Sequence, residues 1–87
     1  MIQVLVIDDE RLARENIILR LECEDEFEVC GQADNGHDAL LLVEKLKPDV
    51  IFLDIDMPGL NGIEAAQKLA HNNDVMIIFV TAYEQHA

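Results

Sequence analysis

Three aspartates stand where two apolar segments end, and their type and placement predict chemistry. Asp8 and Asp9 follow the apolar run 4–7, and Asp54 closes the apolar run 50–53. A strand buried in a parallel sheet is apolar along nearly its whole length, so acids at the ends of these strands indicate a binding or reaction site. In open α/β sheets, ligands bind beyond the carboxyl ends of the strands. If the two strands are neighbours, the three carboxylates form a cation-binding pocket that contains a nucleophile.

A single acid ahead of a helix has a simple structural explanation. It caps free backbone N–H groups and favours the positive end of the helix dipole, which accounts for one of Asp8, Asp9 and Glu10. It does not account for two consecutive acids and a third on another strand, because two carboxylates about 4 Å apart repel by about 4 kcal/mol at an effective dielectric constant of 20. A counter-ion is therefore expected. Mg²⁺ fits, since it binds one or two carboxylates and keeps several waters.

Composition limits the class of protein. The chain has 87 residues and 51% hydrophobic content, which allows at most one domain. Lys and Arg number 6 against 18 Asp and Glu, for a formal net charge of −12, so phosphates of nucleic acid would be repelled. No stretch approaches the roughly 20 apolar residues of a membrane span, and the N-terminus does not resemble a signal peptide. We expect a soluble, cytoplasmic chain that contacts neither membrane nor nucleic acid itself.

Two hydrophobic periodicities alternate along the chain. Apolar runs predict a strand at 2–7 that is buried on both faces, a strand at 49–53 and a buried strand at 75–80, and an alternating pattern predicts an edge strand at 27–33. Helical spacing predicts three helices, at 11–22, around 39–46 and after residue 61. In the first of these, Ala13, Ile17 and Leu21 are expected to face the core, and Arg14, Glu15 and Arg20 to face water. Strands that alternate with helices predict an α/β fold with right-handed crossovers and a parallel sheet.

With these elements in place, the chain resembles the receiver domain of bacterial two-component response regulators over all 87 residues. Asp8 and Asp9 resemble the family's acidic metal-binding pair, and Asp54 resembles its phosphoacceptor. Thr81 resembles its hydroxyl switch residue. The loop that starts at Asp56 is similar to the family loop in which this position gives its backbone carbonyl to Mg²⁺. The resemblance implies a flavodoxin-like, doubly wound parallel sheet in the order 2-1-3-4, with the first and third strands side by side.

The resemblance also implies a function in a phosphorelay. A sensor histidine kinase would pass a phosphoryl group from its phosphohistidine to Asp54, with Mg²⁺ or Mn²⁺ as cofactor. The chain would be a signalling phosphoacceptor and not an enzyme, with at most self-catalysed phosphorylation and dephosphorylation. Backbone N–H groups of Ile55 and Ala82 are expected to donate to the phosphoryl oxygens, and the Thr81 hydroxyl to turn toward them. Without the other motifs, the favoured explanation of Thr81 would be a simple strand-end or cap threonine.

The segment 81–87 is similar to the receivers of LytTR-type transcription factors. This similarity implies that the chain switches a DNA-binding output domain that lies outside it. Tyr83 in this segment is either part of a partner-facing surface or a half-exposed aromatic residue, and the sequence leaves both readings open.

The match to the family is incomplete after residue 87. Receivers have five strands and five helices, so the resemblance implies a C-terminally truncated receiver domain over 1–87 that lacks the fifth strand and the last helix. The family's strand-five lysine has no counterpart among the six basic residues. The apolar strand at 75–80 would then be an open sheet edge suited to strand pairing. We expect a homodimer that joins two such edges or exchanges elements between chains.

Two other classes of function remain open. Asp54-Ile55-Asp56 after an apolar strand also resembles the Asp-x-Asp signature of haloacid-dehalogenase-type phosphatases, with Asp54 as nucleophile, Asp56 as general acid and Thr81 as phosphate-binding hydroxyl. In that family the signature normally ends the first strand of the core, whereas here a complete βαβα unit with its own acid pair comes earlier. The third class is a phosphorylation-independent interaction module whose acids are vestigial.

Overall fold

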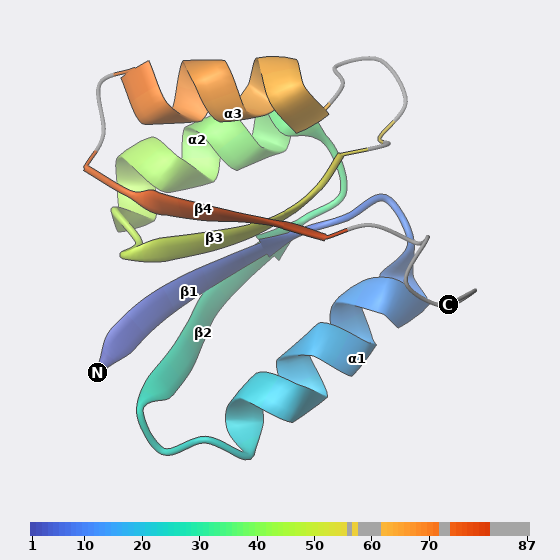
Figure 1. Cartoon of the computed structure of the whole chain (residues 1–87), viewed down its shortest axis with the longest axis vertical. Coiled ribbons are helices and arrows are strands. Elements are labelled where there is room, and N and C mark those ends of the chain that lie inside the picture. The colour runs from blue at the N-terminus through green and yellow to red at the C-terminus, as the bar shows by residue number, and fades with distance from the viewer. Residues whose placement is uncertain (56, 58–61, 72–73, 81–87) are drawn as a thin grey trace.

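The computed structural model of the chain describes residues 1–55, 57, 62–71 and 74–80 (Figure 1). Strands and helices alternate in the order β1 (Ile2–Ile7), α1 (Arg11–Glu22), β2 (Phe27–Ala33), α2 (Gly36–Leu46), β3 (Val50–Asp54), α3 (Gly62–His71) and β4 (Met76–Val80). The strands pair in parallel and form one sheet in the order β2-β1-β3-β4. The predicted α/β fold and strand order 2-1-3-4 are confirmed.

The sheet is covered on both faces, by α2 and α3 on one side and by α1 on the other (Figure 1). Side chains of a strand point alternately to opposite faces, and β1 supplies both layers. Leu5 and Ile7 pack in the core under α2 and α3, while Val4 and Val6 pack in the cluster that includes Leu21 of α1. All four β1 side chains are at most 1% exposed. The prediction that this strand is buried on both faces is confirmed.

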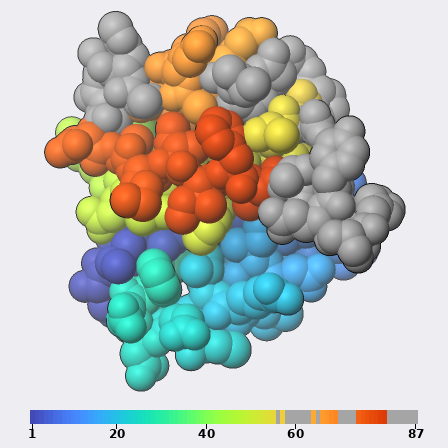
Figure 2. All heavy atoms as spheres, in the orientation of Figure 1, coloured from blue at the N-terminus to red at the C-terminus, as the bar shows by residue number. Residues whose placement is uncertain are grey.

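β4 lies at one edge of the sheet and is more exposed than its apolar sequence predicts. Met76, Ile78 and Phe79 are 63%, 39% and 45% exposed, so the prediction of a buried strand is wrong here. For Met76 and Ile78 the physical reason is the position of α1, which packs on β1 and β2 and does not reach the β4 end of its face. Phe79 pairs with Leu53 and therefore lies on the opposite face, where it is at the edge of the sheet. Figure 2 shows the orange-red atoms of β4 across a broad part of the visible surface.

Local signals hold both ends of α2. The Asn35 side chain accepts a hydrogen bond from the backbone N–H of Asp38 at 2.8 Å, which caps the first turn. At the other end, Lys47 takes a left-handed φ of 48° and its N–H donates to the Val43 carbonyl at 2.9 Å. Pro48 follows and disfavours further helix. α2 therefore ends before Pro48, as predicted.

Candidate metal and phosphoacceptor site

The neighbouring strands β1 and β3 bring the predicted acids together. Ile7 pairs with Leu53 across the two strands, so Asp8 and Asp54, one residue further along, come level at the same edge of the sheet. One carboxylate oxygen from each of Asp8, Asp9 and Asp54 lies within 4.8 Å of the others. The predicted adjacency of the first and third strands, on which the site depends, is confirmed.

Asp8 is the buried member of this acid cluster, the carboxylates of Asp8, Asp9 and Asp54. Its side chain is 5% exposed, whereas Asp54 is half-buried and Asp9 is exposed. Burial, together with the negative charges of Asp54 and Asp9, raises the pKa of Asp8 from 3.8 to about 6, against a lowering effect of the hydrogen bond from the Glu10 backbone N–H. Desolvation and like charge both penalise the ionised form. A cation among the three carboxylates would relieve both penalties.

The donor set fits a hard divalent ion. Mg²⁺ prefers oxygen ligands at about 2.1 Å in octahedral geometry, which places neighbouring ligand oxygens about 3 to 4 Å apart. The three carboxylate oxygens already lie within 4.8 Å of one another, so small side-chain rotations are sufficient to bring them to one ion. Waters would fill the remaining positions, and the exposed side of Asp9 leaves room for them.

The acid turn, residues 8–10, is held by hydrogen bonds from several directions. The Asp8 N–H donates to the Ala33 carbonyl at 3.1 Å, and the Glu10 N–H donates to Oδ1 of Asp8 at 2.9 Å. Arg14 Nη1 donates to the Asp8 carbonyl at 2.7 Å, and Arg14 Nε donates to Gln32 Oε1 at 2.8 Å. Arg14 is half-buried, so the prediction that it faces water is wrong: its side chain is long enough to reach back to the end of β1.

The remaining predicted site residues are placed only in part. The N–H of Ile55 donates to the Val80 carbonyl at 3.4 Å, so it must leave this partner before it can bind a phosphoryl oxygen. Four positions lie outside the described residues, namely Asp56, Thr81, Ala82 and Tyr83. The sequence analysis missed Arg14, which contacts the acid turn, and Gln32, which accepts a hydrogen bond from Arg14. The available signal was an arginine one helical turn after the acids, at the start of α1.

Comparison with known proteins places the chain in a family. Residues 4–87 match the family described as the response regulator receiver domain. The chain belongs to this family. The receiver is 46% identical over 98% of its length to the sensory transduction protein LytT of Oceanobacillus iheyensis, and 44% identical over its whole length to the transcriptional regulatory protein BtsR of Salmonella typhi. It spans 36% of each of these two relatives, about a third of their length.

Solved receiver structures have the same fold. The response regulator domain of Thermotoga maritima CheB superimposes on this receiver with a TM-score of 0.89 at 36% identity, over 94% of this chain and 61% of that one. The receiver domain of the putative response regulator NarL from Mycobacterium tuberculosis gives 0.87 at 33% identity, over 93% and 66% of the two chains. The flavodoxin-like fold and the receiver resemblance are confirmed. Receivers are signalling domains, and the family match gives no support to the phosphatase alternative.

Within the part of the chain that the structure describes, the helices are too short and too polar to cross a lipid bilayer.

Proposed function

We propose that residues 1–87 belong to one receiver domain that accepts a phosphoryl group on Asp54 from the phosphohistidine of a sensor histidine kinase. The observation that carries the proposal is the acid cluster, with three carboxylates within 4.8 Å at the ends of β1 and β3. An Asp54 carboxylate oxygen attacks phosphorus, a P–O bond forms, and the P–N bond to the kinase imidazole breaks, with its electron pair left on the ring nitrogen. The product is an aspartyl phosphate, and the chain is a phosphoacceptor rather than an enzyme with turnover.

We assign Mg²⁺, or Mn²⁺ in its place, to the acid cluster. Asp8, Asp9 and Asp54 would supply carboxylate oxygens, and Asp56 its backbone carbonyl. Bound there, the ion offsets the negative charge that spreads over the transferring phosphoryl oxygens. Asp8 and Asp9 would hold the ion beside the nucleophile, and Asp54 is only half-buried, so a phosphodonor can approach it. Both metals suit this set because both prefer carboxylate, carbonyl and water ligands.

The segment after β4 is proposed as the switch. Asp54 pairs with Val80 across β3 and β4, so β4 ends level with the phosphoacceptor, and Thr81 is the next residue in the sequence. Its hydroxyl and the N–H of Ala82 are assigned to the phosphoryl oxygens, together with the N–H of Ile55 once it releases the Val80 carbonyl. A change at Thr81 would then bias the segment that follows it.

The partners are proposed from charge and from the relatives. A chain with a net charge of −12 is repelled by nucleic-acid phosphates, so DNA is contacted only by an output domain elsewhere in the protein. The relative BtsR is named a transcriptional regulatory protein, which supports such an output. Tyr83 is assigned to a surface that faces the output domain or another partner. We place the whole assembly in the cytoplasm, where the sensor kinase presents its phosphohistidine.

We also propose a homodimer through β4. This strand has one open edge in the described sheet, and Met76 and Ile78 are 63% and 39% exposed beside it. An exposed apolar edge strand pairs readily with another strand. Two copies that join these edges would bury the apolar side chains, and an exchange of elements between chains would have the same effect.

Phosphorylation by a small phosphodonor tests the proposal. With acetyl phosphate and Mg²⁺, the protein is expected to gain the mass of one phosphoryl group per chain, in an acid-stable, base-labile bond. Asp54→Asn should abolish the labelling, and a chelator should prevent it. Asp25→Asn is the matched control, because it removes the same charge from an exposed loop. Labelling that persists in Asp54→Asn, or repeated turnover of a phosphate monoester, would overturn the proposal.

A further inference from the structure

Arg14 connects three parts of the fold. It projects from the first turns of α1, and its guanidinium donates from Nη1 to the Asp8 carbonyl at 2.7 Å and from Nε to Gln32 Oε1 at 2.8 Å. Gln32 lies near the carboxyl end of β2, where it is level with Val6 of β1. The side chain therefore bridges α1, the acid turn and β2, and it contacts the backbone of Asp8, a member of the acid cluster.

We propose that Arg14 is a positioning residue for the metal site, and that Gln32 holds Arg14 in place. This inference rests on the proposed function, because it concerns how the same acid cluster binds Mg²⁺. The target of Arg14 is a backbone carbonyl and not a carboxylate. It fixes the direction in which the acid turn leaves β1, and with it the direction of the Asp8 and Asp9 side chains.

Arg14 does not act as a counter-ion for Asp8. Its guanidinium donates to the Asp8 backbone carbonyl and to Gln32 Oε1, and the ion pair found among the described residues, Arg11–Glu15, does not involve Arg14 or the acid cluster. The carboxylates of the acid turn therefore keep repelling one another while Arg14 is present. Their geometry depends on the backbone that carries them, which Arg14 fixes on one side and the Ala33 carbonyl fixes on the other.

The two donors of Arg14 require a guanidinium. Its planar fork places Nη1 and Nε at fixed positions, so one side chain reaches Asp8 and Gln32 at the same time. A lysine has one ammonium on a flexible stem and cannot reproduce both directions. Groups that orient metal ligands typically change metal affinity by about 10- to 100-fold when they are removed.

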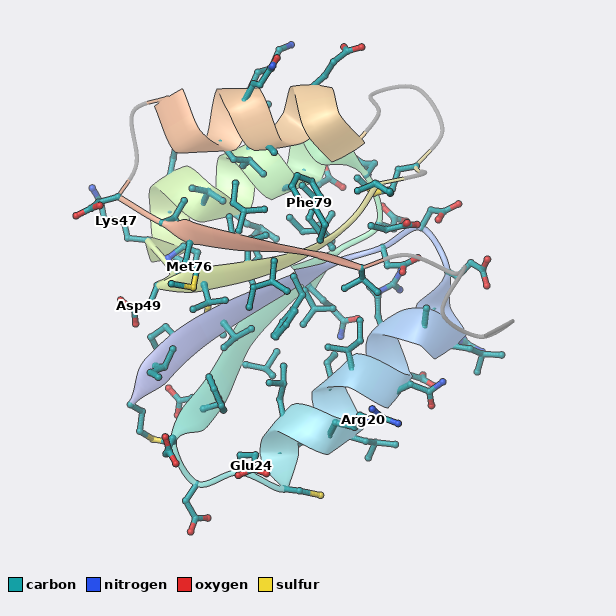
Figure 3. All side chains as sticks on the ribbon, in the orientation of Figure 1. Arg20, Glu24, Lys47, Asp49, Met76 and Phe79 are labelled. Atoms are coloured by element: carbon teal, nitrogen blue, oxygen red, sulfur yellow. The ribbon has the colours of Figure 1, made fainter. Side chains whose placement is uncertain are left out.

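The sign of the change in Mg²⁺ affinity tests the inference. If Arg14 acted only through its charge, Arg14→Met would remove a positive charge from a chain of net charge −12 and would tighten Mg²⁺ binding. Positioning predicts the opposite, a Kd for Mg²⁺ that rises by about 10-fold, measured by calorimetric titration of the purified protein with Mg²⁺ alone. Arg14→Lys keeps the charge and should also weaken binding. Arg20→Met is the charge-matched control on the exposed face of α1 (Figure 3) and should not weaken it.

Variants of Gln32 separate positioning from a general loss of stability. Gln32→Leu removes the acceptor for Arg14 Nε and should raise the Kd for Mg²⁺ several-fold, while Gln32→Glu keeps an acceptor and should restore affinity close to the native value. Val43→Ala, in the core under α2, should lower the Tm and leave the Kd unchanged. Far-UV circular dichroism confirms that each variant is folded before titration.

The outcomes distinguish this inference from the proposed function. If the native protein binds Mg²⁺ and Arg14→Met binds it equally or more tightly, the positioning role is wrong and the metal site stands. If the native protein does not bind Mg²⁺, the proposed function itself fails, and the positioning role fails with it. Weaker binding in Arg14→Met and Gln32→Leu, with native binding in Arg20→Met, supports both.

Discussion

Asp8 and Asp54 come from distant parts of the chain, yet their carboxylates lie within 4.8 Å of each other. They meet because Ile7 pairs with Leu53 in the register of β1 and β3, which brings the next residue of each strand to the same level. The fold therefore gathers like charges around the buried Asp8 before any cation binds. The free energy of unfolding should therefore depend both on the protonation of Asp8 and on a cation bound between these carboxylates.

Without divalent cations, the protein should lose stability as the pH rises through about 6. The pKa of Asp8 is about 6 in the folded chain and 3.8 as its ordinary value, so the folded state binds this proton more tightly. The stabilisation of the fold by this proton is fully present below the ordinary pKa of Asp8 and is lost above the pKa that Asp8 has in the folded chain. The difference between these two pKa values of Asp8 corresponds to roughly 3 kcal/mol in the free energy of unfolding. Urea denaturation between about pH 4 and pH 8 measures it, and added Mg²⁺ should recover much of the loss at the upper end.

Asp8→Asn isolates this contribution. The amide cannot ionise and retains an oxygen that can accept from the Glu10 N–H, so the variant should be more stable than the native protein at pH 8 without metal and should gain little from Mg²⁺. Asp25→Asn, in an exposed loop, serves as the control. If Asp8→Asn and the native protein show the same pH dependence, burial of Asp8 does not contribute as stated.

Gly31→Ala should destabilise the fold by about 1 kcal/mol through overpacking. Gly31 pairs with Leu5 at the irregularity between β1 and β2, and a Cβ there would lie 3.0 Å from Cδ1 of Leu46 and 3.3 Å from Cδ1 of Leu5. Because Leu46 is the closer neighbour, the double variant with Leu46→Ala should lose less stability than the sum of the two single variants. Thermal denaturation of the three variants measures the coupling, and strict additivity would show that Leu46 does not oppose the new methyl group.

Ile78→Lys should weaken self-association at least about 10-fold, since a charge at a buried dimer contact must be desolvated. Ile78 and Met76 lie on the face of β4 that α1 leaves open, and Met76 is labelled in Figure 3. Leu19→Lys makes the same change on α1, where Leu19 is 62% exposed, and should not alter association. Sedimentation velocity at tens of micromolar protein is the measurement. A monodisperse native monomer would contradict the dimer.

Asp49→Ala should cost about 1 kcal/mol by removing a hydrogen bond between the starts of β1 and β3. The Gln3 N–H donates to Oδ2 of Asp49 at 2.9 Å, and the Asp49 N–H donates to the Gln3 carbonyl at 2.8 Å. Asp49→Asn keeps a side-chain acceptor and should lose less. Figure 3 shows Asp49 beside Met76 of β4, whose N–H donates to the Asp49 carbonyl at 3.0 Å. Chemical denaturation of both variants measures the difference, and equal losses would show that the side-chain bond contributes little.

Local patterns in the sequence were sufficient to predict the elements and their order. The apolar run of β1 and the helical spacing of α1 give the bounds 2–7 and 11–22 found in the structure, because a strand or helix repeats its exposure every two or about four residues. The same patterns place acids at the ends of β1 and β3. Adjacency of these strands then followed from the strand order that the family resemblance implies.

Only the tertiary structure decided which groups each side chain contacts. Polarity alone assigns Arg14 to water, but the folded chain brings the Asp8 carbonyl and Gln32 within reach of its guanidinium. An apolar run alone assigns β4 to the interior, but its position at the sheet edge leaves Phe79 45% exposed. In both cases a residue's own type sets what it can contact, while the arrangement of distant segments sets what lies beside it. The sequence thus determined the elements and the acids. The packing of the sheet decided how far each acid is buried, which groups hold its backbone and how its pKa is shifted.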